Sequence, residues 1–176
     1  MRVRSQAGFT LIEVMIGVAI VAILMTMGLP SFTAWIQKAQ IRTAAEAIQS
    51  GLMLARAEAV RRNTRVSFSL AGPDSSWSVA VVNPAAAIQA RTGAEGSNNA
   101  VVTVAAPNAL PVAVEFDGLG RANIATNLLI QVTNPVGGAC GAGLTDMRCL
   151  NVLITPGGTV RMCDPQVATA GDTRRC

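Results

Sequence analysis

The side chains that carry most enzyme chemistry are either absent or scattered in this sequence. The 176 residues include no histidine, which removes the commonest general base and the commonest metal ligand. The carboxylates beyond the amino-terminal third are spread over separate turns and strands: Asp74, Glu95, Glu115, Asp117, Asp146, Asp164 and Asp172. No pair of them is placed for acid and base catalysis, so we expect neither an enzyme nor a bound cofactor.

All four cysteines lie in the last 37 residues: Cys140, Cys149, Cys163 and Cys176. Four thiolates are able to hold zinc, but zinc sites usually contain closely spaced cysteine pairs. Here eight residues lie between Cys140 and Cys149, and twelve lie between Cys163 and Cys176. An even number of cysteines in an exported domain instead favours two disulfides. Three pairings are open, and we favour Cys140 with Cys149 and Cys163 with Cys176, because each closes a turn-rich loop.

One carboxylate, Glu13, lies within a long apolar run from Phe9 to Met27. About 20 apolar residues suffice for a helix to cross the hydrocarbon core of a bilayer. Arg2 and Arg4 precede the run, so we expect a cytoplasmic amino end and an exported carboxyl end. A carboxylate in this setting costs roughly 2.5 to 3.5 kcal/mol at the bilayer centre. Glu13 therefore needs a partner.

The segment Gly8-Phe9-Thr10-Leu11-Ile12-Glu13, with its basic leader, its apolar helix and Pro30, resembles the processing signal of type IV pilins and type II secretion pseudopilins. The resemblance implies that a prepilin peptidase cuts after Gly8 and methylates Phe9. It also implies that Glu13 pairs with the amino terminus of a neighbouring pilin in the filament. Such a pairing would keep the carboxylate charged in a low-dielectric setting and fix the axial register of the subunits.

A helical pattern continues beyond Pro30 to about Asn63. Apolar residues recur there at steps of three and four, which predicts one buried helix face; they are Ile41, Ala45, Ile48, Leu52, Ala55 and Ala59. Residues 38–65 carry six Lys and Arg against two Glu. A basic helix face is usually solvated, while contact with acidic lipid headgroups or with acidic neighbours remains open. Loss of the leader leaves a formal charge of +2, which does not suggest a generally basic nucleic-acid surface.

After Asn63 the pattern changes to short apolar or alternating segments separated by turn residues, which predicts seven strands: 66–70, 77–82, 101–105, 112–116, 128–133, 150–155 and 159–163. Pro156-Gly157-Gly158 predicts a hairpin turn, and Asp117-Gly118-Leu119-Gly120 predicts another turn. Residues 84–100 are expected to form a mobile loop. The fold class is therefore α+β, with the long helix packed on an antiparallel sheet or sandwich.

Three later sequence segments are similar to those of the GspH/FimT group of minor pilins and pseudopilins: Leu54–Val60, Phe116–Gly118 and Gly158–Arg161. The cysteines near the carboxyl end resemble those of pilus-associated FimT- or FimU-like members. Some members of the group bind DNA through a carboxyl-terminal Gly-Arg-x-Arg pattern, from which Gly171-Asp172-Thr173-Arg174-Arg175 departs. Arg161, Arg174 and Arg175 are candidate phosphate contacts, although Asp164 and Asp172 lie in the same loop and no aromatic residue is there to stack on bases.

These observations predict four segments: a cleaved leader over 1–8, a membrane-spanning and assembly half of the helix over 9–29, its second half over 30–63, and an exported domain over 64–176. We expect an inner-membrane minor pilin of a type IV pilus, with a periplasmic domain, that contacts major and minor pilins and the prepilin peptidase. A type II secretion pseudopilin and a DNA-uptake receptor are the alternatives.

Overall fold

The computed structural model describes residues 8–141, 143 and 146–176, except for the side chains of residues 27–31. The predicted leader, 1–8, therefore lies outside the described residues apart from Gly8. The chain divides into two compact units, Met1–Trp35 and Ile36–Cys176. Helix α1, Leu11–Arg62, runs through both of them.

Helix α1 begins and ends where its sequence provides caps. The Thr10 hydroxyl accepts a hydrogen bond from the backbone N–H of Glu13 at 3.3 Å, which satisfies one of the free donors of the first turn. At the other end Asn63 adopts a left-handed conformation with φ of 49°, which asparagine tolerates better than most residues. Arg61 and Arg62 lie in the last turn, where positive charge is favourable.

In the second unit the helix buries the face that the sequence predicts. Its fully buried residues are Ile41, Ala44, Ala45, Ile48, Leu52, Ala55 and Ala59. Burying an isoleucine or leucine side chain contributes about 1.5 to 3 kcal/mol, so Ile41, Ile48 and Leu52 anchor this part of the helix. Alanines between them let the backbone approach the strands closely.

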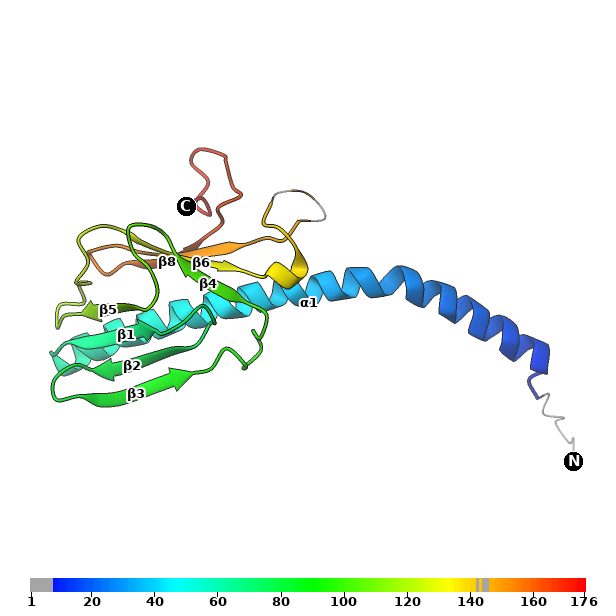
Figure 1. Cartoon of the computed structure of the whole chain (residues 1–176), viewed down its shortest axis with the longest axis horizontal. Helices are drawn as coiled ribbons and strands as arrows, with labels where there is room; N and C mark the ends of the chain where they lie inside the picture. Colours follow the sequence, from blue (N-terminus) through cyan, green and yellow to red (C-terminus); the bar gives the residue numbers. More distant parts are fainter. Residues whose placement is uncertain (1–7, 142, 144–145) are drawn as a thin grey trace, which may run out of the picture. The chain divides into compact units, whose positions relative to one another are not determined.

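Two antiparallel four-stranded sheets form the rest of the second unit as the structure describes it. Sheet A has the order β3-β2-β1-β5, with β1 Val66–Leu70, β2 Trp77–Val81, β3 Ala86–Arg91 and β5 Val112–Phe116. Sheet B has the order β4-β6-β7-β8, with β4 Val101–Val104, β6 Leu128–Thr133, β7 Leu150–Ile154 and β8 Val160–Cys163. A short 3-10 helix, η1, covers Pro135–Gly137. Figure 1 shows the strands gathered around the second half of α1.

Buried and more exposed residues alternate along the strands, and the buried ones form the core between the sheets and the helix. Every second residue of β1 is buried (Val66, Phe68 and Leu70), and β6 repeats the pattern with Leu128, Ile130 and Val132. This period of two is expected when one face of a sheet is covered. The expected α+β fold, a long helix on antiparallel sheets, is confirmed. The hairpin turn at 156–158 is also confirmed, since Gly158 donates to the Thr155 carbonyl at 2.8 Å.

The expectation of a mobile loop over residues 84–100 is wrong. Residues 86–91 form β3, an edge strand of sheet A that pairs with β2. Five of its six residues, Ala-Ala-Ile-Gln-Ala-Arg, are not β-branched or aromatic and most are exposed, so propensity and alternation both miss it. The segment that follows is fixed by a hydrogen bond of 2.7 Å between the buried hydroxyls of Ser75 and Ser97.

Candidate functional site

The residues of the predicted processing signal lie at the start of α1. Phe9 is 86% exposed and precedes the first helical residue, Leu11, by two positions. Glu13 lies in the first turn with an exposed side chain, where a carboxylate is favoured by the partial positive charge of the helix end. Because Thr10 caps the backbone of Glu13, the Glu13 carboxylate is not required for that cap and remains available to a partner.

The first half of α1 exposes apolar side chains on every side. Twelve large ones, counting Phe9 just before the helix, are 49% to 86% exposed: Phe9, Leu11, Ile12, Val14, Met15, Ile16, Val18, Ile20, Val21, Ile23, Leu24 and Met25. A helix that is apolar all round is normally buried in protein or in lipid. Among the helical residues that the structure describes, none form a segment that is both long and apolar enough to cross a membrane. The predicted span, 9–29, ends at residues whose side chains lie outside the described part, and it stays a prediction.

A second feature joins α1, the 117–120 turn and the β7–β8 turn, which contain or adjoin the three later segments that resemble the GspH/FimT group. The Arg56 guanidinium of α1 donates through Nε to the carbonyl oxygen of Gly120 at 3.0 Å. Gly158, in the β7–β8 turn, packs directly against that same carbonyl, and a Cβ at Gly158 would overlap it. We call this meeting point of Arg56, Gly120 and Gly158 the Arg56 junction. It is where helix α1, the 117–120 turn and the β7–β8 turn come together. It ties α1 to the ends of both sheets.

The 117–120 turn at this junction is held by its aspartate. Asp117 Oδ1 accepts hydrogen bonds from the backbone N–H groups of Leu119 and Arg121, both at 2.9 Å. The bond from the Arg121 N–H is the main reason that the pKa of Asp117 lies below its usual range. Gly118 faces the end of α1, because a Cβ there would come within 3.2 Å of the backbone carbon of Asn63. The turn thus fixes where the helix ends against sheet A.

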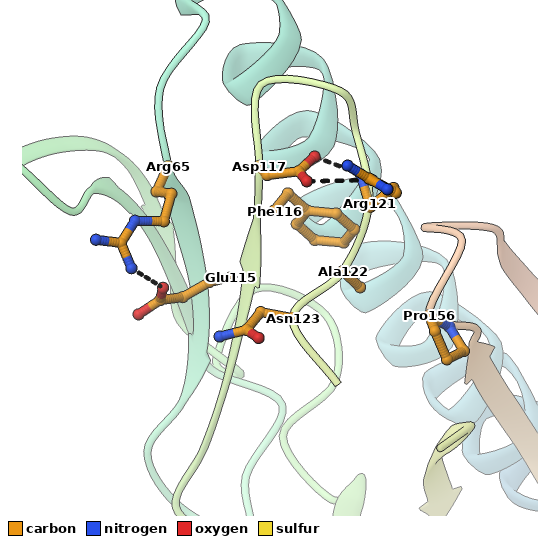
Figure 2. A pocket seen from close by; sticks show the side chains of 8 residues that line it. All are labelled: Arg65, Glu115, Phe116, Asp117, Arg121, Ala122, Asn123 and Pro156. Atoms are coloured by element: carbon orange, nitrogen blue, oxygen red, sulfur yellow. Dashed lines mark hydrogen bonds and ion pairs between the residues drawn. The ribbon is translucent and has the colours of Figure 1, made fainter. Parts of the chain in front are cut away.

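A polar groove of about 390 Å³ lies beside this turn. Figure 2 shows its lining, with two ion pairs on the walls: Arg65 with Glu115 at 3.5 Å, and Arg121 with Asp117 at 3.3 Å. Each carboxylate is thus neutralised by an arginine of the same chain. The groove presents Asn123 and the apolar side chains of Phe116, Ala122 and Pro156 besides these pairs, which is not a set of groups suited to acid and base catalysis.

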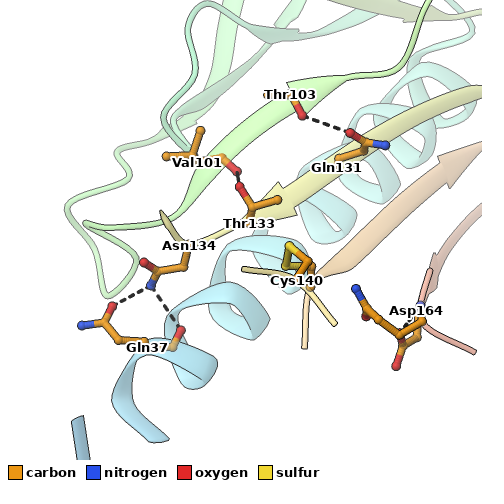
Figure 3. The surroundings of a disulfide bond; sticks show 10 residues. Gln37, Val101, Thr103, Gln131, Thr133, Asn134, Cys140 and Asp164 are labelled. Atoms are coloured by element: carbon orange, nitrogen blue, oxygen red, sulfur yellow. Dashed lines mark hydrogen bonds between the residues drawn. A yellow bond between two sulfur atoms is a disulfide. The ribbon is translucent and has the colours of Figure 1, made fainter. Parts of the chain in front are cut away.

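The cysteines form the sequential pairs, Cys140 with Cys149 and Cys163 with Cys176. The first pair follows β6 and η1, in a region that also contacts the helix. Asn134, which is fully buried, donates through Nδ2 to the Gln37 side-chain oxygen at 2.6 Å and to the Gln37 carbonyl at 3.3 Å (Figure 3). The loop that carries Cys140 is thus tied to α1 at one end and to β7 through Cys149 at the other.

The structure brings the three candidate DNA-binding arginines together, but two of them hold the tail. Arg161 donates through Nη1 to the carbonyl oxygens of Arg175, at 3.1 Å, and Thr173, at 3.5 Å. Arg174 pairs with Asp172 at 2.8 Å, and hydrogen bonds from the Arg174 side chain lower the pKa of Asp172 to about 2. Arg175 is exposed and forms no ion pair among the described residues. Contact with DNA stays a prediction that now rests mainly on Arg175.

An amino-terminal helix with an exposed apolar half, packed in its second half on antiparallel sheets, defines the pilin-like class of subunits. Two family models match the chain. Residues 3–29 match the prokaryotic N-terminal methylation motif, and residues 44–158 match the family described as type II transport protein GspH. The second match covers well over half of the chain, and the chain belongs to this family. Its members are structural pilins and pseudopilins, which are not enzymes.

Solved structures of two minor subunits share the fold. The type IV minor pilin FimU of Pseudomonas aeruginosa is 19% identical in one crystal form, with a TM-score of 0.54 over 73% of this chain and 99% of that one. The minor pseudopilin EpsH of the Vibrio cholerae type 2 secretion system is 12% identical, with a TM-score of 0.53 over 73% of this chain and 99% of that one. No curated protein sequence matches this chain.

The Arg56 junction is the feature that sequence reasoning missed. The segments that contain Arg56 and Gly158 both resemble the GspH/FimT group, whereas Gly120 lies just outside the third such segment, and nothing in the sequence predicts that the three residues meet. Arg56 and Gly120 are 64 residues apart in the chain. The available signal was a pair of glycines in turn sequences, Gly120 and Gly158, both of which have a positive φ and lie close to another segment.

Proposed function

We propose that this chain is a minor pilin of a type IV pilus. In this proposal the prepilin peptidase removes residues 1–8, Phe9 becomes the methylated amino terminus, and residues 9–29 hold the subunit in the inner membrane with its domain in the periplasm. The observation that carries the proposal is the apolar first half of α1. Eleven exposed apolar side chains of this half, from Leu11 to Met25, overlap the processing signal and extend beyond it. They need lipid around them before assembly and other subunits after it.

Glu13 would act as the assembly contact of this segment. Its side chain is exposed, and the hydrogen bond to Thr10 already satisfies its own N–H. In a filament of parallel helices the carboxylate would meet the cationic amino terminus of a neighbour. A charged pair in an apolar setting is stable only when both partners are present, so this contact would make incomplete or misaligned packing unfavourable.

The disulfide-bonded tail supports a pilus component over a secretion pseudopilin. The carboxyl-terminal cysteines are the feature by which the sequence resembles pilus-associated members of its group, and both pairs lie outside the helix that the two kinds of subunit share. The fold itself does not favour either, since a pilus subunit and a secretion subunit match it about equally well. The second candidate is therefore a minor pseudopilin of a type II secretion system.

Deletion of the gene in its own host distinguishes the two candidates. For a pilus component we expect surface pili to fall by about tenfold or more, because filament initiation depends on minor subunits, while proteins exported by type II secretion stay at their normal level outside the cell. Restoring the wild-type gene should restore the pili. Normal pili with lost secretion would replace this proposal by the pseudopilin, and normal pili with normal secretion would contradict both.

A further inference from the structure

The solvent side of the second half of α1 carries an apolar groove. Met53, Ala57 and Val60 line it together with Arg56 and Arg61, and its volume is about 530 Å³. Met53 is 46% exposed and Val60 51% exposed. Leu119, which is 74% exposed, extends the apolar surface from the neighbouring turn, where Gly120 lies against Val60. We call this surface, formed by the solvent-facing side chains of residues 53–62 and by Leu119, the groove face.

Charge within the second unit is distributed unevenly between paired and unpaired groups. Its residues include twelve Lys and Arg against nine Asp and Glu. Seven of the nine carboxylates form ion pairs with arginines of the same unit. The other two are bonded within their own loops, Asp74 to the Ser76 hydroxyl and Asp146 to the Gly143 N–H. The unit therefore has no cluster of unpaired carboxylates, since all its charged residues are described.

The groove face has an excess of positive charge. Arg61 and Arg62 share a single carboxylate, Glu58, at 2.6 and 2.7 Å, and their hydrogen bonds lower its pKa to about 2. One negative charge therefore stands against two positive charges. Among the residues that the structure describes, Arg56 forms no ion pair; its Nε donates to the Gly120 carbonyl, and its side chain lines the groove. A partner that covers these residues must bring carboxylates of its own, or the cations lose water without compensation.

We propose that the groove face binds a different pilin subunit, one that presents an apolar surface edged with carboxylates, and that it does not bind a second copy of this chain. This inference rests on the proposed function and specifies the partner. In a second copy the side-chain carboxylates are already paired with arginines or hydrogen-bonded within their own loops, and pairing groove face with groove face would bring like charges together. The surface thus selects a heterologous neighbour.

The composition of the groove face favours protein over lipid as the partner. Basic segments that recognise anionic lipid headgroups usually carry clusters of four to eight Lys and Arg. Residues 53–62 have only three arginines, with Glu58 among them. Their apolar residues are instead set on a rigid helix that is anchored by Ala55 and Ala59 on its buried side, a geometry suited to packing against another helix or sheet.

Site-specific photocrosslinking of the full-length chain in its host tests this inference. A photoreactive amino acid at Leu119 should give an adduct with a pilin-family subunit of different sequence, and the crosslinked peptide should contain Asp or Glu. An adduct between two copies of this chain, an adduct with lipid alone, or the absence of any pilin adduct would overturn the inference.

A charge-swap pair supplies the control. With the probe kept at Leu119, Ala57→Glu should lower the yield of the adduct by at least about fivefold, because it adds a negative charge facing an acidic partner. Ala57→Arg, of similar size and also helix-compatible, should retain most of it. An equal loss of adduct in both variants would show that charge does not determine binding at the groove face, which contradicts the inference. The amount of chain in sheared filaments is measured in parallel: its absence there contradicts the proposed function, whereas its presence with a self-adduct overturns only this inference.

Discussion

Replacing Gly158 by alanine is expected to destabilise the folded domain by about 3 kcal/mol or more. Gly158 has φ of 78°, in the left-handed region that side chains other than glycine rarely adopt. Its position also leaves no room, because an added Cβ would overlap the Gly120 carbonyl and come within 3.2 Å of Arg56 Nε. The substitution therefore strains the β7–β8 turn and separates the two partners that tie α1 to the sheets.

Gly157→Ala is the matched control for this prediction. It changes the neighbouring residue of the same turn, where an added Cβ meets only the Thr155 hydroxyl at 3.8 Å, and it should shift stability by less than about 1 kcal/mol. Thermal unfolding of the two full-length variants and the wild type in detergent makes the comparison. Similar melting temperatures for Gly158→Ala and wild type would show that the Arg56 junction does not stabilise the domain.

Replacing Glu13 by alanine is expected to lower incorporation of the chain into filaments by about tenfold or more while leaving its domain folded. Glu13 lies in the first unit, Met1–Trp35, and the hydrogen bond at the helix start uses its backbone N–H and the Thr10 hydroxyl rather than its carboxylate. The loss should therefore fall on contacts with neighbouring subunits. The measurement is the ratio of this chain in sheared filaments to this chain in membranes.

Glu13→Gln separates charge from shape in the same assay. Glutamine keeps the length of the side chain and removes the negative charge, so pairing with a cationic amino terminus predicts a loss close to that of alanine. Normal incorporation of Glu13→Ala would show that the carboxylate is not an assembly determinant. Normal incorporation of Glu13→Gln with impaired Glu13→Ala would show that packing, and not charge, is what the neighbour requires.

Much of the fold could be predicted because each predicted element has a local cause. The helix face from Ile41 to Ala59 repeats at three and four residues, and the 156–158 turn contains a proline and two glycines. Strand β3 could not be predicted, since its stability comes from backbone pairing with β2 at the edge of sheet A and not from its alanine-rich side chains. Its existence depends on the tertiary setting.

The candidate site likewise has a part that could be predicted from local sequence and a part that depends on tertiary contacts. The processing signal is contiguous in sequence, so the methylation motif over residues 3–29 could be recognised from residue order alone, while the roles of Gly8, Phe9 and Glu13 stay predictions. The Arg56 junction requires three segments to meet, and no local pattern encodes that contact. The carboxyl-terminal tail could be predicted in part. The sequence places Asp172 beside the tail arginines, and it pairs with Arg174. The hydrogen bonds from Arg161 to the tail carbonyls could not be predicted, because they depend on the bend that places residues 173–175 beside β8.

The central claim, that this chain is processed and assembled as a pilin, is tested most directly by mass spectrometry of the protein extracted from membranes of its host. The account predicts a chain that begins at Phe9 with an N-methylated amino group, because the leader, the glycine and the helix start meet at the Gly8–Phe9 bond. A chain that still begins at Met1, or one cut beyond Met27, would contradict it.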